Sequence, residues 1–226
     1  IWAMGEQLKC GDFVPFVFEH KFNMEVGDGD RKQLMSGTID RVDICENGTD
    51  VYVRIIDYKT GKKDFNIVKT YYGIDIQLMV YMEAAMKLVA KMRPGKNVIP
   101  AGVFYYNISD PIVSATTESA EEIEDKIKGE LRLKGMVNSD KDIAEKMDNT
   151  EGTSLNIPVS RKADGGFDSR RSKVMNTEQF NILGRFVDVR AIDTADRIVG
   201  GDIRRSPYKD GQFSSCDRCP YGAVCG

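Results

Sequence analysis

The sequence has 226 residues, of which 41% are hydrophobic and 30% are charged, and its formal net charge is −3. These values fit a globular protein of one good-sized domain or two small ones, and they argue against a general nucleic-acid coat. No apolar run reaches the roughly 20 residues of a membrane-spanning helix, and no secretory signal stands at the start. We therefore expect a cytoplasmic protein, and because the first residue is Ile1 we expect a fragment of a longer chain.

The first quarter of the chain predicts three strands. Residues 13–23 are aromatic and β-branched, and residues 35–45 and 51–59 flank Asn47-Gly48, a strong hairpin signal. The Val and Ile residues of the third stretch indicate a buried central strand.

The remaining elements alternate between helix and strand. Apolar residues recur at helical spacing after Gly73, and Pro94-Gly95 ends that helix. We predict, in order, a helix over 73–92, a strand over 98–108, a helix over 116–137, a long loop over 138–175, a helix over 177–199 capped by Thr177, and an irregular tail. This order predicts an α/β fold with a central mixed β-sheet flanked by helices.

Two aspartates and a lysine stand near the ends of the hairpin strands. Strand side chains alternate with a period of two, so Asp57 and Lys59 share one face of their strand. The hairpin brings Asp40 alongside them. Hard cations such as Mg²⁺ and Mn²⁺ bind one or two carboxylates, waters and substrate phosphate, and a nearby lysine can orient a water. An ordinary Asp–Lys pair on a solvated strand end is the other interpretation.

Gln77 and Tyr81 stand four residues apart on one face of the helix that follows. A glutamine amide and a tyrosine hydroxyl on an apolar face need hydrogen-bond partners when they are buried. We interpret both as supporting residues of the same site, although a tyrosine packed into the core would give the same pattern.

The ordered stretches "GTIDRVD", "IIDYKTGK" and "YYGIDIQLMVY" resemble the RecB-type branch of the PD-(D/E)xK nuclease superfamily. The resemblance covers residues 37–81 and implies a restriction-endonuclease-like core. It implies that Asp40 and Asp57 bind a divalent metal, that Lys59 is catalytic, and that Gln77 and Tyr81 support the site.

One feature departs from this family. Many members carry a metal-binding histidine on a helix upstream of the first strand, whereas the one histidine here, His20, lies inside the first predicted strand. We interpret His20 as a structural or solvent-facing residue. Glu19, which precedes Asp40 by one strand, is a candidate third metal ligand, and a charge at a strand edge is its alternative interpretation.

Three of the five cysteines lie in the last eleven residues, as Cys216-x₂-Cys219-x₅-Cys225. Thiolates at this spacing can bind one metal, and a zinc site would take a fourth ligand from Cys10, Cys45 or outside the chain. A nuclease domain followed by these cysteines resembles the AddB family of helicase–nuclease subunits. That resemblance implies a [4Fe-4S] cluster on Cys216, Cys219 and Cys225, with its fourth cysteine before Ile1 and the cluster absent from this fragment.

We therefore predict two parts, a nuclease domain over 1–208 and a cysteine-rich tail over 209–226. By resemblance, the substrate is single-stranded DNA, the partner is an AddA-like helicase–nuclease subunit, and the role is double-strand-break repair. The lysines Lys62, Lys63 and Lys69 and the basic stretch 160–173 are candidates for contact with DNA. A free-standing Cas4-like exonuclease and a nuclease-inactive DNA-binding scaffold are the alternatives.

Overall fold

The hairpin at Asn47-Gly48 starts the sheet that organises the molecule. In the computed structural model, which describes residues 2–27, 29, 32–108, 119–211 and 213–225, β2 and β3 pair antiparallel up to Asn47 and Asp50. Gly48 turns the chain with a φ of 60°, which glycine adopts without a steric penalty. The strands of the described chain are β1 (Val14–Val26), β2 (Gln33–Asn47), β3 (Asp50–Lys59), β4 (Asn97–Asn107), β5 (Lys134–Asn138), β6 (Val174–Met175), β7 (Lys209–Asp210) and β8 (Phe213–Ser214).

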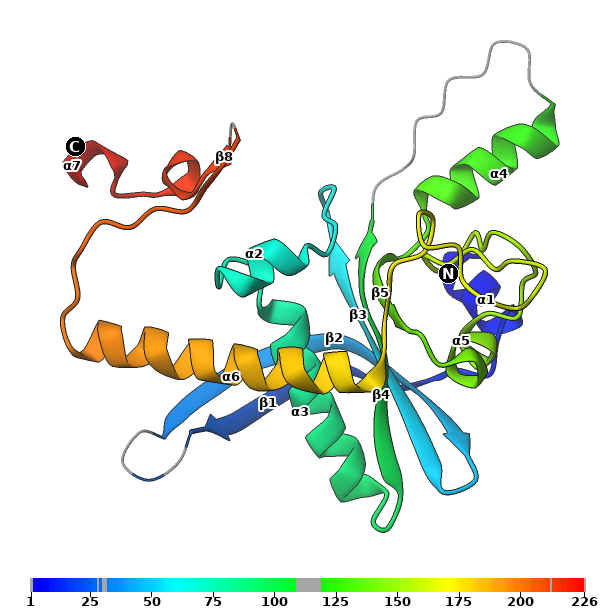
Figure 1. Cartoon of the computed structure of the whole chain (residues 1–226), viewed down its shortest axis with the longest axis horizontal. Coiled ribbons are helices and arrows are strands. Elements are labelled where there is room, and N and C mark those ends of the chain that lie inside the picture. Colours follow the sequence, from blue (N-terminus) through cyan, green and yellow to red (C-terminus); the bar gives the residue numbers. More distant parts are fainter. Residues whose placement is uncertain (1, 28, 30–31, 109–118, 212, 226) are drawn as a thin grey trace.

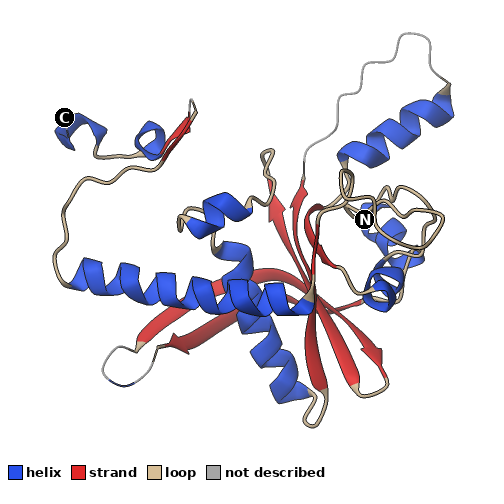
Figure 2. Ribbon diagram, viewed as in Figure 1, coloured by secondary structure: helices blue, strands red, loops and turns tan. Residues whose placement is uncertain are grey.

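The first six strands form one mixed sheet in chain order, β1 to β6. The β3–β4 and β5–β6 pairs are parallel and the others are antiparallel. Helices lie on both sides of this sheet (Figures 1 and 2). They are α1 (Trp2–Lys9), α2 (Ile67–Tyr71), α3 (Gln77–Met92), α4 (Ala120–Glu130), α5 (Lys141–Met147), α6 (Thr177–Val199), a 3₁₀ turn (Ser215–Arg218) and α7 (Gly222–Cys225). The predicted α/β class with a central mixed sheet is confirmed.

Two apolar cores lie on opposite faces of the sheet. Alternation along β3 sends Val51, Val53 and Ile55 to the core that α3 and α6 cover. The intervening Tyr52 and Ile56 enter the second core, where α5 packs. The predicted division of this strand between two faces is therefore correct.

Two predicted elements differ from the structure after β4. The helix predicted to reach residue 137 ends at Glu130, and Lys134–Asn138 is the strand β5. Gly135 and Val137 are poor helix formers, and the side chains of Leu133 and Val137 are buried in the second core, so both local preference and burial favour a strand here. Residues 116–118 of that predicted helix lie outside the described residues.

The long loop predicted over 138–175 contains α5 and, at its end, β6. Asp140 caps α5, because its carboxylate accepts hydrogen bonds from the backbone N–H groups of Asp142 and Ile143. The cap of α6 is Asn176, in a capping box with Gln179, rather than the predicted Thr177.

Replacing Gly135 by alanine tests the close approach of β5 to β4. An added Cβ would collide with the carbonyl oxygen of Val103. We expect the free energy of unfolding to fall by about 1–3 kcal/mol, measured by chemical denaturation. Gly129→Ala is the control, since a Cβ there meets open space on α4, and it should stabilise by about 0.5–1 kcal/mol. Equal effects at both positions would contradict the tight packing.

Candidate active site

Asp40 and Asp57 face each other where β2 separates from β3. The last β2–β3 pair joins Arg41 to Ile56, so the next step of the same register sets Asp40 across from Asp57. The backbone N–H of Tyr58 donates instead to Asp40 Oδ2 at 2.7 Å. The Asp40 side chain thus satisfies an amide that the ladder leaves unpaired, and this bond fixes the carboxylate beside β3.

Asp57 occupies a buried position beside a lysine. It is 2% exposed, and its carboxylate forms an ion pair with Lys59 Nζ. Burial raises the pKa of Asp57, the Lys59 ammonium opposes that rise, and the Asp40 carboxylate adds to it. Asp40, Asp57 and Lys59 therefore interact electrostatically in one place, as the sequence predicts.

The Asp57 carboxylate has the features of a cation ligand. Its Oδ2 is buried and is paired with the Lys59 ammonium. A buried carboxylate is costly unless positive charge compensates it, and here Lys59 supplies part of that charge. Two carboxylates also suit Mg²⁺, which usually keeps several waters. Among the described residues, no group of three or more His, Cys, Asp or Glu side chains could hold a metal ion, so the fit is to a two-carboxylate site.

Gln77 and Tyr81 lie on the first turns of α3. Gln77 Nε2 donates to the Tyr81 hydroxyl at 2.8 Å, and the Tyr81 ring packs edge-on against Phe22 with centroids 5.8 Å apart. Burial and then Asp75 raise the pKa of Tyr105, and Asp57 and Tyr81 add to the rise; Tyr105 pairs with Asp57 across β4 and β3. The helix thus directs this pair toward the face of the sheet that carries Asp57.

A buried network beside the site was missed by the sequence analysis. The Tyr105 hydroxyl donates to Asp75 Oδ1 at 2.6 Å, and Lys63 Nζ lies 3.0 Å from the same oxygen. Lys63 Nζ also lies 4.5 Å from the centroid of the Tyr105 ring. The segment after Lys59 is therefore tied to β4 next to Asp57. The sequence signal was an aspartate, Asp75, in the first turn of the helix predicted over 73–92.

A second buried network lies on the opposite face of the same strands. Asp43 accepts hydrogen bonds from Arg41 Nε at 2.6 Å, from Arg41 Nη2 at 2.7 Å and from Arg54 Nε at 2.9 Å. All three side chains are at most 1% exposed, and burial lowers the pKa of Arg54. This network, Arg41–Asp43–Arg54, was also missed. The signal was available, because the hairpin register pairs Asp43 with Arg54.

Glu19 has an unusual backbone next to the candidate metal ligands. It lies between the pairs Phe18–Arg41 and His20–Ile39, which sets it across from Asp40. Its φ of 47° is in the left-handed region, where a residue other than glycine is strained. Its side chain is exposed, and the described residues do not unite it with Asp40 and Asp57 in a three-ligand group. His20 is half-buried and lines a separate groove between β1 and α3.

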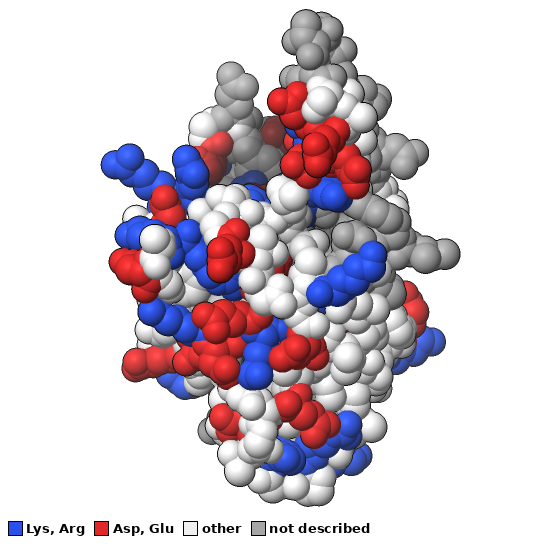
Figure 3. Space-filling view, turned by 90° about the vertical axis from the view of Figure 1, so that its right-hand side faces the viewer, with Lys and Arg blue, Asp and Glu red and all other residues white. Residues whose placement is uncertain are grey.

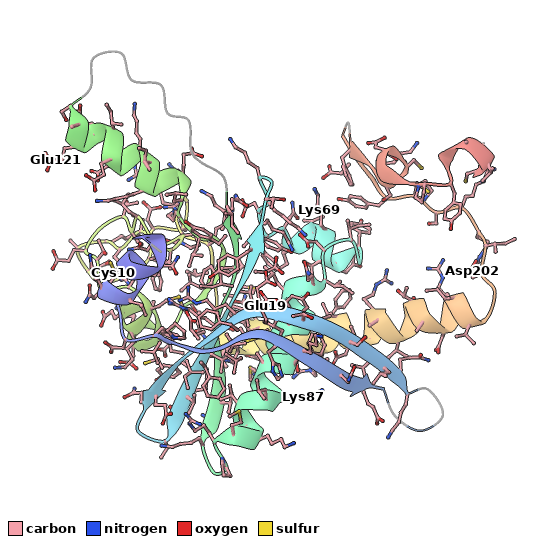
Figure 4. All side chains as sticks on the ribbon, turned by 180° about the vertical axis from the view of Figure 1, so that it is seen from behind. Cys10, Glu19, Lys69, Lys87, Glu121 and Asp202 are labelled. Atoms are coloured by element: carbon pink, nitrogen blue, oxygen red, sulfur yellow. The ribbon has the colours of Figure 1, made fainter. Side chains whose placement is uncertain are left out.

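The three tail cysteines are exposed free thiols. Their donor chemistry fits iron–sulfur or zinc, but within the described part of the chain they form no group that could hold a metal ion. Cys45 is buried in the second core, where burial raises the pKa of its thiol. Cys10 lies across the molecule from the tail (Figure 4). Neither is therefore placed to complete a zinc site with the tail.

The first arginine of the basic stretch 160–173 has a structural role. Arg161 donates to the backbone carbonyls of Thr150, Ala144 and Asp148 at 2.6–2.8 Å. Its guanidinium thereby holds an irregular segment against α5, so these donors stabilise the fold.

Among the described helices, none is both long and apolar enough to cross a membrane.

The comparisons with known proteins agree with one another. The family model of the PD-(D/E)XK nuclease superfamily matches residues 1–226. The whole chain also aligns with curated proteins that are named as a subunit of an ATP-dependent helicase/deoxyribonuclease. It is 38% identical over 236 residues to the one from Clostridium botulinum strain Hall and 35% identical to the one from Thermoanaerobacter sp. strain X514. The alignment covers 100% of this chain and 20% of each relative, so the chain spans a fifth of their length.

Proposed function

Because the chain belongs to the PD-(D/E)XK nuclease superfamily, we propose that it is the nuclease domain of an AddB-like helicase–nuclease subunit. It hydrolyses phosphodiester bonds of single-stranded DNA during double-strand-break repair in the cytoplasm. An AddA-like helicase–nuclease subunit delivers the strand. The observation that carries this proposal is the cross-strand pair Asp40 and Asp57 with Lys59 ion-paired to Asp57.

Asp40 and Asp57 are the residues that would hold Mg²⁺ or Mn²⁺. Such an ion, when bound, polarises the phosphodiester and lowers the pKa of a water. Asp40 is held by the Tyr58 amide and Asp57 by burial, so both carboxylates are preorganised. Glu19 is proposed as a third ligand, supported by its position across from Asp40 and its strained backbone.

The remaining residues act on the water and the substrate. The Lys59 side chain is 27% exposed, so its ammonium reaches solvent and can hold the attacking water and offset charge on the phosphate oxygens. Gln77 orients the Tyr81 hydroxyl through their hydrogen bond, and the pair supports the site from α3. These roles are supported by the ion pair between Lys59 and Asp57 and by the hydrogen bond between Gln77 and Tyr81.

The tail is proposed as a second functional part. Residues 1–208 form the nuclease domain, and the tail over 209–226 belongs to an iron–sulfur staple. Cys216, Cys219 and Cys225 supply three thiolates to a [4Fe-4S] cluster whose fourth cysteine lies elsewhere in the full-length protein. The exposure of all three thiols supports this role, since none of them is committed to the core.

Replacing Lys59 by alanine tests the proposed function. We expect cleavage of a 5′-labelled single strand in Mg²⁺ to slow by about 10²-fold or more, because the donor to the water and phosphate is lost. The affinity for Mn²⁺, measured by titration calorimetry, should change little, because the carboxylates remain. Because the proposed substrate is single-stranded, the wild-type protein should cut the same oligonucleotide more slowly when it is annealed to its complement.

Lys96→Ala is the control, since Lys96 is exposed and donates to the backbone carbonyl of Gly48, beyond the other end of β3 from Lys59. A Lys59→Ala variant with the full rate would remove the assigned role. A wild-type chain that binds DNA but never cuts it would favour the nuclease-inactive scaffold.

A further inference from the structure

A polar groove lies between α2, the C-terminal half of α6 and the segment that leads into the tail. Its volume is about 860 Å³, which is within the range of pockets that hold a ligand. Two residues labelled in Figure 4 adjoin the groove: Lys69 on α2 follows the lining residue Val68, and Asp202 after α6 binds the lining residues Arg197 and Arg204. We name it the α2–α6 groove, and it is lined by Asn66, Val68, Tyr72, Gly73, Ile74, Arg190, Thr194, Arg197, Arg204, Ser206, Pro207, Tyr208, Lys209, Asp210 and Ser215.

Basic side chains dominate the charged lining of the groove. Four basic residues line it, against the single acidic residue Asp210: Arg190, Arg197, Arg204 and Lys209. Asp202 fixes the positions of the Arg197 and Arg204 side chains, because it accepts hydrogen bonds at 2.8 Å from Arg197 Nε and from Arg204 Nη2. The Arg204 side chain is still 82% exposed, so further donors face solvent. These positive groups contrast with a whole chain of net charge −3.

One of the basic groups has an unused donor. Arg190 Nε is buried and has no hydrogen-bond partner, and its guanidinium is only loosely paired with Asp193 at 3.8 Å. A buried donor without a partner is uncommon in folded proteins. Arg190 lines the groove and its side chain is 36% exposed, so the guanidinium can meet an anionic group there.

Aromatic rings stand among these charges. Tyr72 and Tyr208 both line the groove, with ring centroids 4.9 Å apart. Lys69 Nζ lies 4.7 Å from the ring centroid of Phe213, whose ring is 6.2 Å from that of Tyr208. Cations that alternate with aromatic faces are the arrangement that binds the phosphates and stacks the bases of single-stranded nucleic acids.

The groove begins in the segment that follows the catalytic strand. Asn66 lines it and also caps α2, seven residues after Lys59. The same short segment carries Lys63, which is ion-paired to Asp75 beside Tyr105. By contrast, the face seen in Figure 3 intersperses basic and acidic side chains over its described part.

We infer that the α2–α6 groove binds a segment of single-stranded DNA adjacent to the active site. The phosphates contact Arg190, Arg204 and Lys209, and the bases stack against Tyr72 and Tyr208. This inference rests on the proposed nuclease function and adds the surface that holds the strand.

Reversing two charges in the groove tests the inference. The double variant Arg204→Glu/Lys209→Glu changes two exposed side chains, and binding of fluorescein-labelled oligo(dT) to the full chain is measured by anisotropy in EDTA. We expect affinity to fall on the order of tenfold or more. The slope of log affinity against log salt should shrink by about 1.4, because two phosphate contacts are lost at ~0.7 each. Tyr72→Leu, which keeps the charge, should weaken binding at least about fivefold through lost stacking.

The matched control is Lys87→Glu/Lys91→Glu, the same charge change at exposed positions that line the other groove between β1 and α3. It should leave oligo(dT) affinity and its salt slope nearly unchanged. Equal losses in both double variants, or an unchanged slope in the first, would overturn the inference. Tighter binding of a duplex of equal length than of oligo(dT) would also overturn it.

A small diester separates this inference from the proposed function. Bis(p-nitrophenyl) phosphate needs the Asp57 site but cannot extend into the groove, so the groove variants should hydrolyse it at the wild-type rate. Loss of that hydrolysis in the groove variants would overturn the assignment to DNA holding. If the wild-type chain did not hydrolyse the diester but still bound oligo(dT) through the groove, the nuclease function would be rejected and the DNA-binding inference would stand.

Discussion

Replacing Asp57 by asparagine is expected to reduce DNA hydrolysis by about 10³-fold or more, which corresponds to roughly 4 kcal/mol of lost transition-state stabilisation. The substitution removes the charge of a buried proposed ligand that is ion-paired with Lys59. It leaves the volume of the side chain almost unchanged, so packing on β3 should persist. Cleavage of a labelled single strand in Mg²⁺ or Mn²⁺ measures the loss.

The same variant should not lose stability at neutral pH. Burial raises the pKa of Asp57, so the folded state binds its proton more tightly than the unfolded state. The stability that this group contributes is present below its ordinary pKa of 3.8 and is lost as the pH rises through the raised value. Asparagine removes this pH dependence, and denaturation of both proteins between pH 4 and pH 8 measures it.

Asp50→Asn is the control, because Asp50 lies at the other end of β3 and accepts a hydrogen bond from the side chain of Asn97. It should cut at the wild-type rate. An Asp57→Asn variant that cuts normally would place the catalytic carboxylate elsewhere. One that is inactive because it is unfolded would instead show an early denaturation midpoint, which separates the two explanations.

The parts of the fold that the sequence predicted are those that local chemistry decides. Asn47-Gly48 fixes the turn and therefore the register, which sets Asp40 across from Asp57 on the neighbouring strand. No distant residue is needed for that inference. The candidate site could therefore be assembled from residues 37–81, and the structure brings Asp40, Asp57 and Lys59 together.

The parts that were missed depend on contacts between distant segments. β5 is a short segment that follows a helix, and its place in the sheet depends on Gly135 packing against Val103 and on the burial of Val137. The Tyr105–Asp75 hydrogen bond joins residues 30 positions apart. The α2–α6 groove combines residues from 66 to 215. No periodicity within one window of sequence reports such contacts.

The register of the hairpin also implies the buried ion cluster behind the active site. Asp43 stands directly across from Arg54, and Arg41 reaches the same carboxylate with two hydrogen bonds. The cluster begins one strand position away from Asp40, on the opposite face of the sheet. It therefore holds β2 and β3 together immediately before the two strands separate at the candidate metal ligands.

Replacing Asp43 by alanine is expected to lower the free energy of unfolding by about 3–5 kcal/mol. The substitution leaves the guanidinium groups of Arg41 and Arg54 buried without their carboxylate. Such uncompensated charge is far more costly than the loss of a surface ion pair. Urea denaturation followed by circular dichroism measures the change, and the midpoint should fall well below that of the wild type.

Glu46→Ala is the control, because Glu46 lies on the same strand and pairs with Arg93 at an exposed site. Its effect on the midpoint should be small. The triple variant Arg41→Leu/Asp43→Leu/Arg54→Met should recover most of the stability lost in Asp43→Ala, since it removes the buried charges together. If Asp43→Ala alone were as stable as the wild type, Arg41 and Arg54 would have to be solvated, contrary to their exposures of 1%. If the triple variant were less stable than both the wild type and Asp43→Ala, the three side chains would contribute mainly by packing rather than by compensating charge.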